Sequence, residues 1–312
     1  MSLYTRVDMT LSIIVSTFNI RDLLRDCLLS LEKARPAMKK AGYSFEVIVS
    51  DNGADDTDEM IKKEFPYIKY RRNGNIGFSA GNNIVRDLCI GEYVLMLNAD
   101  TMVEEDTLPE SIKYMENHPN VGAMTCKIVM TDGTLDRDAR RSFPTPWVAF
   151  THMSKLDRLF PKSKLFGRYW VGYLDPDMES EADVIEGAYC LVPKKIMDKI
   201  NWYDEDYFLN GEDIDLCWKI WKQGYKIMYV PHIKISHYKG AAKGKAQKPG
   251  VKVNVELETK RKVLIAGADA MKIFYTKHYK DKYPAVMSGA VLSGIWVMKQ
   301  IRLIKFNMTG KI

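Results

Sequence analysis

The stretch at residues 11–31, LSIIVSTFNIRDLLRDCLLSL, decides the fold class, because it joins a strand to a helix. Its first six residues form an apolar run of strand length. Leu24, Cys27, Leu28 and Leu31 then follow the i, i+3, i+4, i+7 spacing of a helix with one buried face. We therefore expect a strand that leads directly into a helix.

The same alternation continues through the first hundred residues. Further strands are predicted at residues 45–50, 68–72 and 93–97, and the Asn/Gly-rich segment 73–83 opens a helix. Alternating strands and helices build an α/β fold, with a mostly parallel sheet flanked by helices. Each predicted strand ends in polar or glycine residues. Ligands of open α/β sheets bind beyond the carboxyl ends of the strands, so we expect the site there.

The pattern loosens beyond residue 100. We expect a helix at 108–117, a hairpin turn at Asp132 and Gly133, and a Pro/aromatic region at 143–173 that supplies acceptor loops. Strands are predicted at 183–192, 226–230 and 234–237. The Lys/Gly/Ala-rich segment 241–251 is typical of a loop or linker.

Composition limits the class of protein. The chain has 312 residues, of which 46% are hydrophobic, enough for a large core. Five cysteines lie scattered in apolar runs without metal-ligand spacing, which favours buried thiols in the cytosol. The first residues lack the pattern of a signal peptide. The net charge of +6 is modest and forms no aromatic-interleaved stripe, so a nucleic-acid partner is not expected.

The C-terminal tail has its own composition. No acidic residue follows Asp281, and lysines and arginines bracket the apolar run 285–298. That run is shorter than the roughly 20 helical residues that cross a bilayer core. Its basic residues and Trp296 favour a segment that lies on an anionic membrane surface. The alternative is a helix packed on the catalytic core or on a partner.

Three carboxylates fall where a loop becomes a helix, in YFLNGEDIDLCWKIWKQGY at residues 207–225. They are Glu212, Asp213 and Asp215. The helix is predicted from a buried stripe and a C-terminal glycine. The stripe consists of Ile214, Cys217, Trp218 and Trp221, and the glycine is Gly224. The carboxylates suit either chemistry or simple capping of the helix N-terminus.

Other polar residues at predicted strand ends suit a nucleotide, a diphosphate and a metal. Asp51 suits the imide N–H of uracil or thymine, or a turn in Asp-Asn-Gly. Asn98, Ala99 and Asp100 place oxygen ligands for Mg²⁺ or Mn²⁺ at a strand end, and His237 suits the same shell or plain hydrogen bonding.

Two further groups suit phosphate or backbone contact with a ligand. Arg140 and Arg141 suit a phosphate or an ordinary surface. The segment at 73–83 lets the backbone approach a ligand but matches neither G-x-G-x-x-G nor the Walker lysine motif, which argues against a dehydrogenase or a P-loop NTPase. Its candidate residues are Asn73, Gly74, Gly77, Gly81 and Asn82.

Seven segments together resemble, in order, those of inverting glycosyltransferases of family 2, which have the GT-A fold. They are SIIVSTFN (12–19), SDNGADD (50–56), NIGFSAGNN (75–83), LMLNAD (95–100), EGAYCLVPK (186–194), YFLNGEDIDLCWK (207–219) and VPHIKISH (230–237). The resemblance implies a nucleotide-sugar donor. It places Thr17, Asn19 and Asp51 near the nucleoside, Asp100 and His237 at the metal, and Asp213 as general base.

The implied reaction is a single in-line displacement that inverts the anomeric carbon, with Asp213 taking the proton of the acceptor hydroxyl. Glu212 and Asp215 then orient the base or bind the acceptor. Two positions depart from the family. Asn98 replaces one member of the acidic pair at the metal strand, and Lys219 replaces an arginine.

The LNAD variant, the RRSFP stretch at 140–144 and the tail most resemble those of bacterial rhamnosyltransferases of cell-wall and O-antigen assembly. The resemblance implies dTDP-L-rhamnose as donor and a lipid-diphosphate-linked saccharide as acceptor, on the cytoplasmic face of the membrane. A UDP-sugar donor, a non-catalytic scaffold and a sugar nucleotidyltransferase are the alternatives, and the oligomeric state stays open. We expect a catalytic domain at 1–250, with a nucleotide half at 1–100 and an acceptor half at 101–250. A helical, amphipathic, membrane-associating extension is expected at 251–312.

Overall fold

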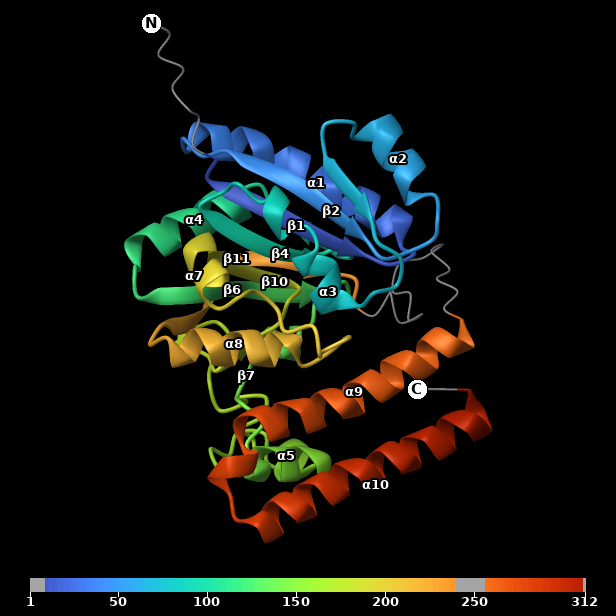
Figure 1. Ribbon diagram of the computed structural model, residues 1–312. Coiled ribbons are helices and arrows are strands. Elements are labelled where there is room, and N and C mark those ends of the chain that lie inside the picture. Colours follow the sequence, from blue (N-terminus) through green and yellow to red (C-terminus); the bar gives the residue numbers. More distant parts are fainter. Residues whose placement is uncertain (1–8, 240–255, 311–312) are drawn as a thin grey trace, which may run out of the picture.

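The computed structural model describes residues 9–239 and 256–310 (Figure 1). Its centre is a nine-stranded sheet in which eight strands follow the order β3-β2-β1-β4-β10-β6-β11-β5, and β8 pairs with β11. The strands are β1 Leu11–Thr17, β2 Phe45–Asp51, β3 Lys69–Arg72, β4 Tyr93–Asn98, β5 Thr101–Val103, β6 Val121–Met130, β8 Ser180–Glu181, β10 Tyr189–Pro193 and β11 Lys226–His237. A separate two-stranded sheet consists of β7 Arg140–Arg141 and β9 Val184–Ile185.

Helices cover both faces of the sheet (Figure 1). The helices before the carboxylate segment are α1 Arg21–Lys40, α2 Thr57–Glu64, α3 Phe78–Asn83, α4 Thr107–Asn117, α5 Pro146–Met153, α6 Leu156–Leu159 and α7 Lys194–Lys199. Those from there on are α8 Glu212–Lys222, α9 Leu257–His278 and α10 Ala285–Thr309. The predicted α/β class and C-terminal helices are therefore confirmed.

Strand direction divides the sheet in two. The first four strands are parallel, as their in-register pairs Leu11↔Phe45 and Leu11↔Tyr93 show. Beyond them β10 runs antiparallel between β4 and β6, and β11 runs parallel to β6. Parallel strands end on the same side, so the polar residues after β1, β2 and β4 meet at one edge.

The alternation of side chains along β1 builds a hydrophobic layer on each face of the sheet. Ile13 and Val15 pack with α1 residues such as Leu24, whereas Ile14 packs on the opposite face with Met96. Successive side chains of a strand point to opposite faces, which explains the split. All five cysteines are free and buried, as predicted.

Several predicted elements have different limits from those expected. The segment 183–192 forms two strands, β9 and β10, which belong to different sheets. The strands predicted at 226–230 and 234–237 are one strand, β11, whose register against β6 shifts between Val230 and Lys234. A β-bulge of this kind bends a strand without ending it. The segment 241–251 lies outside the described residues.

Helix α8 forms as predicted, but its buried face differs by one residue. Cys217 and Trp218 are buried, whereas Trp221 is 49% exposed. Leu216 and Ile220 occupy the core instead. The expectation of a buried Trp221 is wrong, because this helix packs its buried face over β9, β6 and β11 and leaves that indole at the rim.

Helix α9 packs directly against α8. Trp218 lies 5.7 Å from the ring of Phe274 and 5.4 Å from that of Tyr279, and His278 Nε2 lies 2.7 Å from Asp215 Oδ1. The alternative of a helix packed on the catalytic core was stated for the run 285–298, which lies in α10, so the packing of α9 does not test it. The division at residues 250 and 251 falls outside the described residues and stays a prediction.

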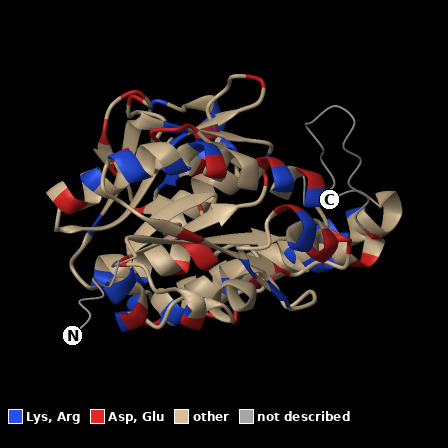
Figure 2. Cartoon of the chain, turned by 90° about the horizontal axis from the view of Figure 1, so that it is seen from above, with Lys and Arg blue, Asp and Glu red and all other residues tan. Residues whose placement is uncertain are grey.

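Helix α10 lies along α9 and is mostly exposed (Figure 1). Within the described residues, no helix has both the length and the apolarity needed to span a membrane. Seen from above, positively and negatively charged residues alternate along the helices and loops around the sheet (Figure 2).

Candidate functional site

A cavity of about 1320 Å³ runs from the carboxyl ends of β1 and β4, past the start of α8, to helices α5, α9 and α10. Its lining includes most of the predicted site residues: Thr17, Gly77, Asn98, Asp100, Arg141, Glu212, Asp213 and His237. Residues from six separate segments thus meet in one hollow. Asn19, Asp51, Asn73, Asn82 and Asp215 lie outside this lining.

Three buried polar atoms at the strand end of the cavity have no hydrogen-bond partner in the described chain. They are Ser16 Oγ, Thr17 Oγ1 and Asn52 Oδ1, and all three residues line the cavity. Buried polar groups in native proteins are nearly always satisfied, by protein or by a ligand. Unpaired acceptors and hydroxyls in a cavity therefore indicate a polar ligand here.

Asp51 lies next to this end, is fully buried and accepts four hydrogen bonds. Its Oδ1 accepts from Gly53 N at 2.8 Å. Its Oδ2 accepts from Tyr70 Oη at 2.6 Å and from Arg72 Nε and Nη2 at 3.1 and 3.0 Å. Three of these donors converge on Oδ2 and one reaches Oδ1, so the carboxylate is held firmly and Oδ1 keeps a further acceptor site.

The predicted asparagines hold the loops around the strand ends. Asn19 Oδ1 accepts from Ala54 N at 2.7 Å, which ties the loop after β1 to the loop after β2. Asn73 Nδ2 donates to Ser50 Oγ at 2.7 Å. Asn82 Nδ2 donates to Phe78 O at 2.8 Å. Their amides therefore shape the wall of the cavity from behind.

Gly77 is needed where α3 begins. Its φ is +92°, a conformation that side chains rarely adopt. A Cβ at this position would also lie 2.5 Å from Phe208 O. The chain can therefore pass close to the loop before α8 only with glycine here.

His237 lies between two carboxylates at the metal end of the cavity. Its Nε2 is 3.2 Å from Asp100 Oδ1 and its Nδ1 is 3.1 Å from Asp136 Oδ2. Burial lowers the pKa of His237, but the hydrogen bonds with Asp100 and Asp136 outweigh it and raise that pKa to about 10. Both ring nitrogens of His237 therefore face carboxylate oxygens.

Glu186 and Lys239 complete this cluster. Ligand atoms of Glu186, Asp136 and His237 lie within 4.8 Å of one another. Burial, and then the charge of Asp136, raise the pKa of Glu186 to about 8. Lys239 Nζ donates to Asp136 Oδ1 at 2.5 Å and contacts Asp138 and Glu186. Its ammonium balances carboxylates that would otherwise repel one another.

The cluster fits a divalent cation. Glu186 Oε2 is buried and has no hydrogen-bond partner in the described part of the chain. Three carboxylates and one imidazole are a donor set that Mn²⁺ and Mg²⁺ accept. The sequence predicts Asp100 and His237 at the metal; the residues whose ligand atoms lie together are Asp136, Glu186 and His237, and Asp100 contacts His237.

Arg141 and Asp213 form a buried ion pair in the middle of the cavity. Arg141 is held in β7, which pairs with β9, and Asp213 lies in the first turn of α8. Burial disfavours the charged guanidinium, but Asp213 and Tyr169 outweigh it and hold the pKa of Arg141 well above its usual value. Among the described residues, Asp213 Oδ1 accepts from its neighbour Ile214 N, and no side-chain hydrogen bond caps α8.

The other two carboxylates of α8 have separate surroundings. Glu212 is buried and lines the cavity beside Asp213. Asp215 points away from it, toward His278 at 2.7 Å and Lys219 Nζ at 3.7 Å. The geometry therefore attaches Asp215 to the packing of α9.

Arg140 also points away from the cavity. It donates to Ser180 Oγ at 2.6 Å and to two backbone oxygens, and it stacks over Tyr229. Sequence reasoning missed five polar residues of the site: Ser16, Asn52, Asp136, Glu186 and Lys239. Glu186 is the first residue of the segment EGAYCLVPK, and Lys239 follows His237 by two positions. Their position in or next to these segments was the sequence signal that could have identified them.

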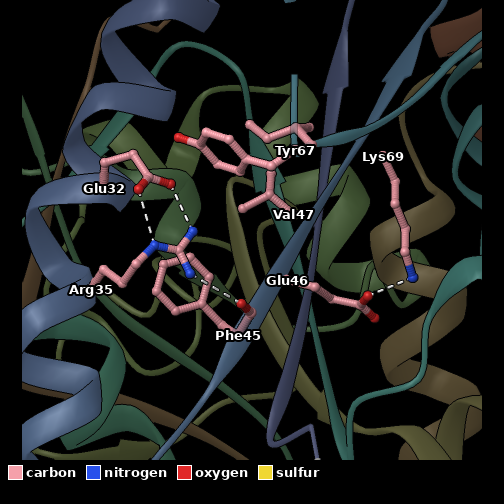
Figure 3. Close-up of a pocket in the computed structure, with 8 residues that line it drawn as sticks. Glu32, Arg35, Phe45, Glu46, Val47, Tyr67 and Lys69 are labelled. Carbon is pink, nitrogen blue, oxygen red and sulfur yellow. Dashed lines mark hydrogen bonds and ion pairs between the residues drawn. The ribbon is translucent and has the colours of Figure 1, made fainter. Parts of the chain in front are cut away.

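A second hollow, of about 450 Å³, lies at the opposite ends of β2 and β3 (Figure 3). Arg35 donates to Glu32 and Lys69 donates to Glu46 at 2.6 Å. Arg35 also lies over the ring of Phe45, 4.2 Å from its centroid. Its charged groups therefore satisfy one another, unlike those of the large cavity.

The fold is that of GT-A glycosyltransferases. The chain superposes on GalNAc-T7 with UDP, GalNAc and Mn²⁺ with a TM-score of 0.57 and 16% identity, over 88% of this chain and 49% of that one. It also superposes on the mannosyltransferase PcManGT from Pyrobaculum calidifontis, in complex with GDP-Man and Mn²⁺. The TM-score is 0.52 and the identity 15%, over 97% of this chain and 76% of that one. At such low sequence identities, the structural similarity shows a shared fold and nothing more.

Residues 12–170 match the model of glycosyl transferase family 2, and residues 93–248 match that of glycosyl transferase family group 2. The chain therefore belongs to glycosyl transferase family 2. It is 25% identical to rhamnosyltransferase WbbL of Escherichia coli K12 over 203 residues, 62% of this chain and 73% of that protein. It is 24% identical to the N-acetylglucosaminyl-diphospho-decaprenol L-rhamnosyltransferase of Mycobacterium tuberculosis over 230 residues, which are 70% of this chain and 71% of that protein.

Proposed function

We propose that this glycosyltransferase moves L-rhamnose from dTDP-L-rhamnose to a hydroxyl of a lipid-diphosphate-linked saccharide, with inversion of the anomeric carbon. The observation that carries the proposal is a single cavity with two chemically distinct regions. The first region contains unpaired polar atoms of Ser16, Thr17 and Asn52, and the second contains the Arg141–Asp213 ion pair. A donor at the first presents its anomeric carbon toward the second.

Asp213 acts as the general base. Its carboxylate takes the proton of the acceptor hydroxyl while that oxygen bonds to the anomeric carbon, and the bond from this carbon to the diphosphate breaks. The electron pair of that bond leaves with the diphosphate. Arg141 holds Asp213 in place, and Glu212 is positioned to bind acceptor hydroxyls.

The remaining predicted residues have direct or supporting roles at the donor. Thr17, Gly77 and Asn98 line the cavity and contact the donor. Asn19, Asp51, Asn73 and Asn82 position the loops that form its walls. Asp51 holds Arg72 and Tyr70 through its Oδ2 at this end of the cavity.

Asp100, Asp136, Glu186 and His237 would hold Mn²⁺ or Mg²⁺. The cation, when bound, neutralises charge that develops on the leaving diphosphate. Lys239 and Arg141 supply further positive charge to the same region.

The two named rhamnosyltransferases support the rhamnosyl donor, and the name of the mycobacterial one supports a lipid-linked acceptor. Exposed apolar residues of α10, including Val286, Trp296 and Ile304, beside Lys299, Arg302 and Lys305 support attachment to the cytoplasmic face of an anionic membrane.

Calorimetric titration of the purified protein with dTDP, UDP and GDP, each with Mn²⁺, Mg²⁺ or chelator, tests the proposal. We expect metal-dependent binding in which dTDP is tightest. A clear preference for UDP would assign a UDP-sugar donor, such as a galactofuranose or N-acetylhexosamine nucleotide, on the same fold. Absence of nucleotide binding would instead indicate a non-catalytic scaffold.

A further inference from the structure

The far end of the large cavity is lined by apolar side chains from three helices. We name it the apolar groove and define it by Phe150, Met153, Gly267, Met271, Gly294 and Met298, which all line the cavity. They come from α5, α9 and α10, which lie next to one another in Figure 1. The groove is continuous with the part of the cavity that holds Asp213.

The apolar groove is open to solvent. Phe150 is 55% exposed and Met153 is 47% exposed, although both line the cavity. Trp147 and Met287 are further exposed lining residues. Soluble proteins rarely leave such a contiguous apolar surface uncovered unless it binds something.

The cavity is larger than one small ligand requires. Its volume of about 1320 Å³ exceeds the roughly 300–1,000 Å³ of typical small-molecule sites. A nucleotide sugar at the strand end leaves the apolar groove unfilled, because the polar groups suited to it all lie at the other end. A second ligand, apolar in part, fits the remainder.

The charge at the groove is positive. Arg302 lines the cavity, is exposed, and has no ion-pair partner in the chain as described. Helix α10 contains no acidic residue, and its Lys299 is already paired with Asp269. An occupant with both a hydrocarbon chain and a phosphate group therefore matches the groove and its cation.

We propose that the apolar groove between α5, α9 and α10 binds the first isoprenoid units of the acceptor's lipid, with Arg302 facing its diphosphate. This inference rests on the proposed function, since it assigns a place to the lipid of that acceptor. It explains why α9 and α10 belong to the site: the chain anchors the saccharide so that its hydroxyl reaches Asp213.

Two glycines of α10 provide a matched test. A Cβ on Gly294 or on Gly289 meets nothing within 4 Å, so a side chain can start at either position without a clash at its Cβ. Gly294 lines the cavity and Gly289 does not. The two lie about 140° apart around the helix. Gly294→Phe therefore fills the groove, and Gly289→Phe places the same side chain outside it.

The probe is farnesyl diphosphate, with methyl diphosphate as the lipid-free comparison, titrated into the full chain. Each buried methylene tightens binding about fourfold, so wild type and Gly289→Phe should prefer the farnesyl compound by well over tenfold. Gly294→Phe should abolish that preference. Met298→Gln, which adds no bulk, should reduce it and protects the test against a misfolded Gly294→Phe protein.

Equal affinity of wild type for both diphosphates would overturn the inference. So would a Gly294→Phe protein that keeps the farnesyl preference and changes only from dimer to monomer in sedimentation, because the groove would then bind a second copy. dTDP binding is measured in parallel on every variant. If the wild-type protein does not bind dTDP, the proposed function is contradicted. If it binds dTDP but does not prefer farnesyl diphosphate over methyl diphosphate, this inference alone is contradicted.

Discussion

Arg141 and Asp213 lie 72 positions apart in the chain, and their side chains form an ion pair in the centre of the cavity. Both side chains are about nine-tenths buried. The pair brings together two structural units, the small sheet β7–β9 and the N-terminus of α8. The general base is therefore positioned by tertiary contacts and not by its helix alone.

Removal of Arg141 should affect catalysis and stability together. Arg141→Ala leaves a buried carboxylate without its cation, which costs about 3 kcal/mol of unfolding free energy. The loss of one preorganised cation near the leaving group should lower kcat about 100-fold. Arg141→Lys keeps the positive charge and should recover part of the lost stability and part of the lost kcat. Chemical denaturation and transfer assays measure the two effects, and an unchanged kcat in Arg141→Ala would contradict this role.

Removal of the metal should stop turnover reversibly. Chelator should abolish sugar transfer, and Mn²⁺ or Mg²⁺ should restore it. Glu186→Gln keeps the size of the side chain but removes a charged donor, so Mn²⁺ affinity should fall about 10- to 100-fold in equilibrium titrations. Glu181→Gln, on the exposed strand β8, is the matched control and should leave Mn²⁺ affinity unchanged. Full activity of the wild type in chelator would exclude a required metal.

Asp51 and Tyr70 offer a way to separate scaffold from ligand contact. Tyr70→Phe removes one hydrogen bond to Asp51 and should cost about 1 kcal/mol of stability with little change in dTDP affinity. Asp51→Ala leaves Arg72 without its partner and should weaken both folding and nucleotide binding. Should Tyr70→Phe weaken dTDP binding as strongly as Asp51→Ala, Tyr70 itself would belong to the nucleotide site.

His278 should fasten α9 to the catalytic helix. His278→Ala removes the 2.7 Å contact to buried Asp215 and the ring beside Trp218, which should cost about 2 kcal/mol. Hydrogen exchange should then speed up along α9 before the sheet is affected. Equal protection of α9 in both proteins would show that the aromatic cluster alone holds this helix.

The sequence predicted the sheet better than it predicted the site. Strands such as β1 and β4 are continuous apolar runs, so local pattern sufficed. Strand β11 was split in the prediction because its bulge between Val230 and Lys234 interrupts the apolar pattern without ending the pairing.

Candidate site residues could be predicted from the sequence only where motifs mark strand or helix ends. Thr17, Asp100 and His237 lie at strand ends, Asp213 lies in the first turn of α8, and the fold brings all four to one cavity. Asp136 instead lies in the loop after β6, and nothing local marks it. Its part in the cluster becomes visible only when β11 places His237 beside it, 101 positions later.

The central claim is that Asp213 is the general base, and Asp213→Asn tests it most directly. Asparagine keeps the size of the side chain but cannot accept the acceptor proton. Transfer from dTDP-L-rhamnose to a lipid-linked acceptor and calorimetric donor binding are measured on the same preparations. We predict that turnover falls by about 100-fold or more while dTDP affinity stays within a few-fold of wild type. Transfer at the wild-type rate by Asp213→Asn would contradict the account.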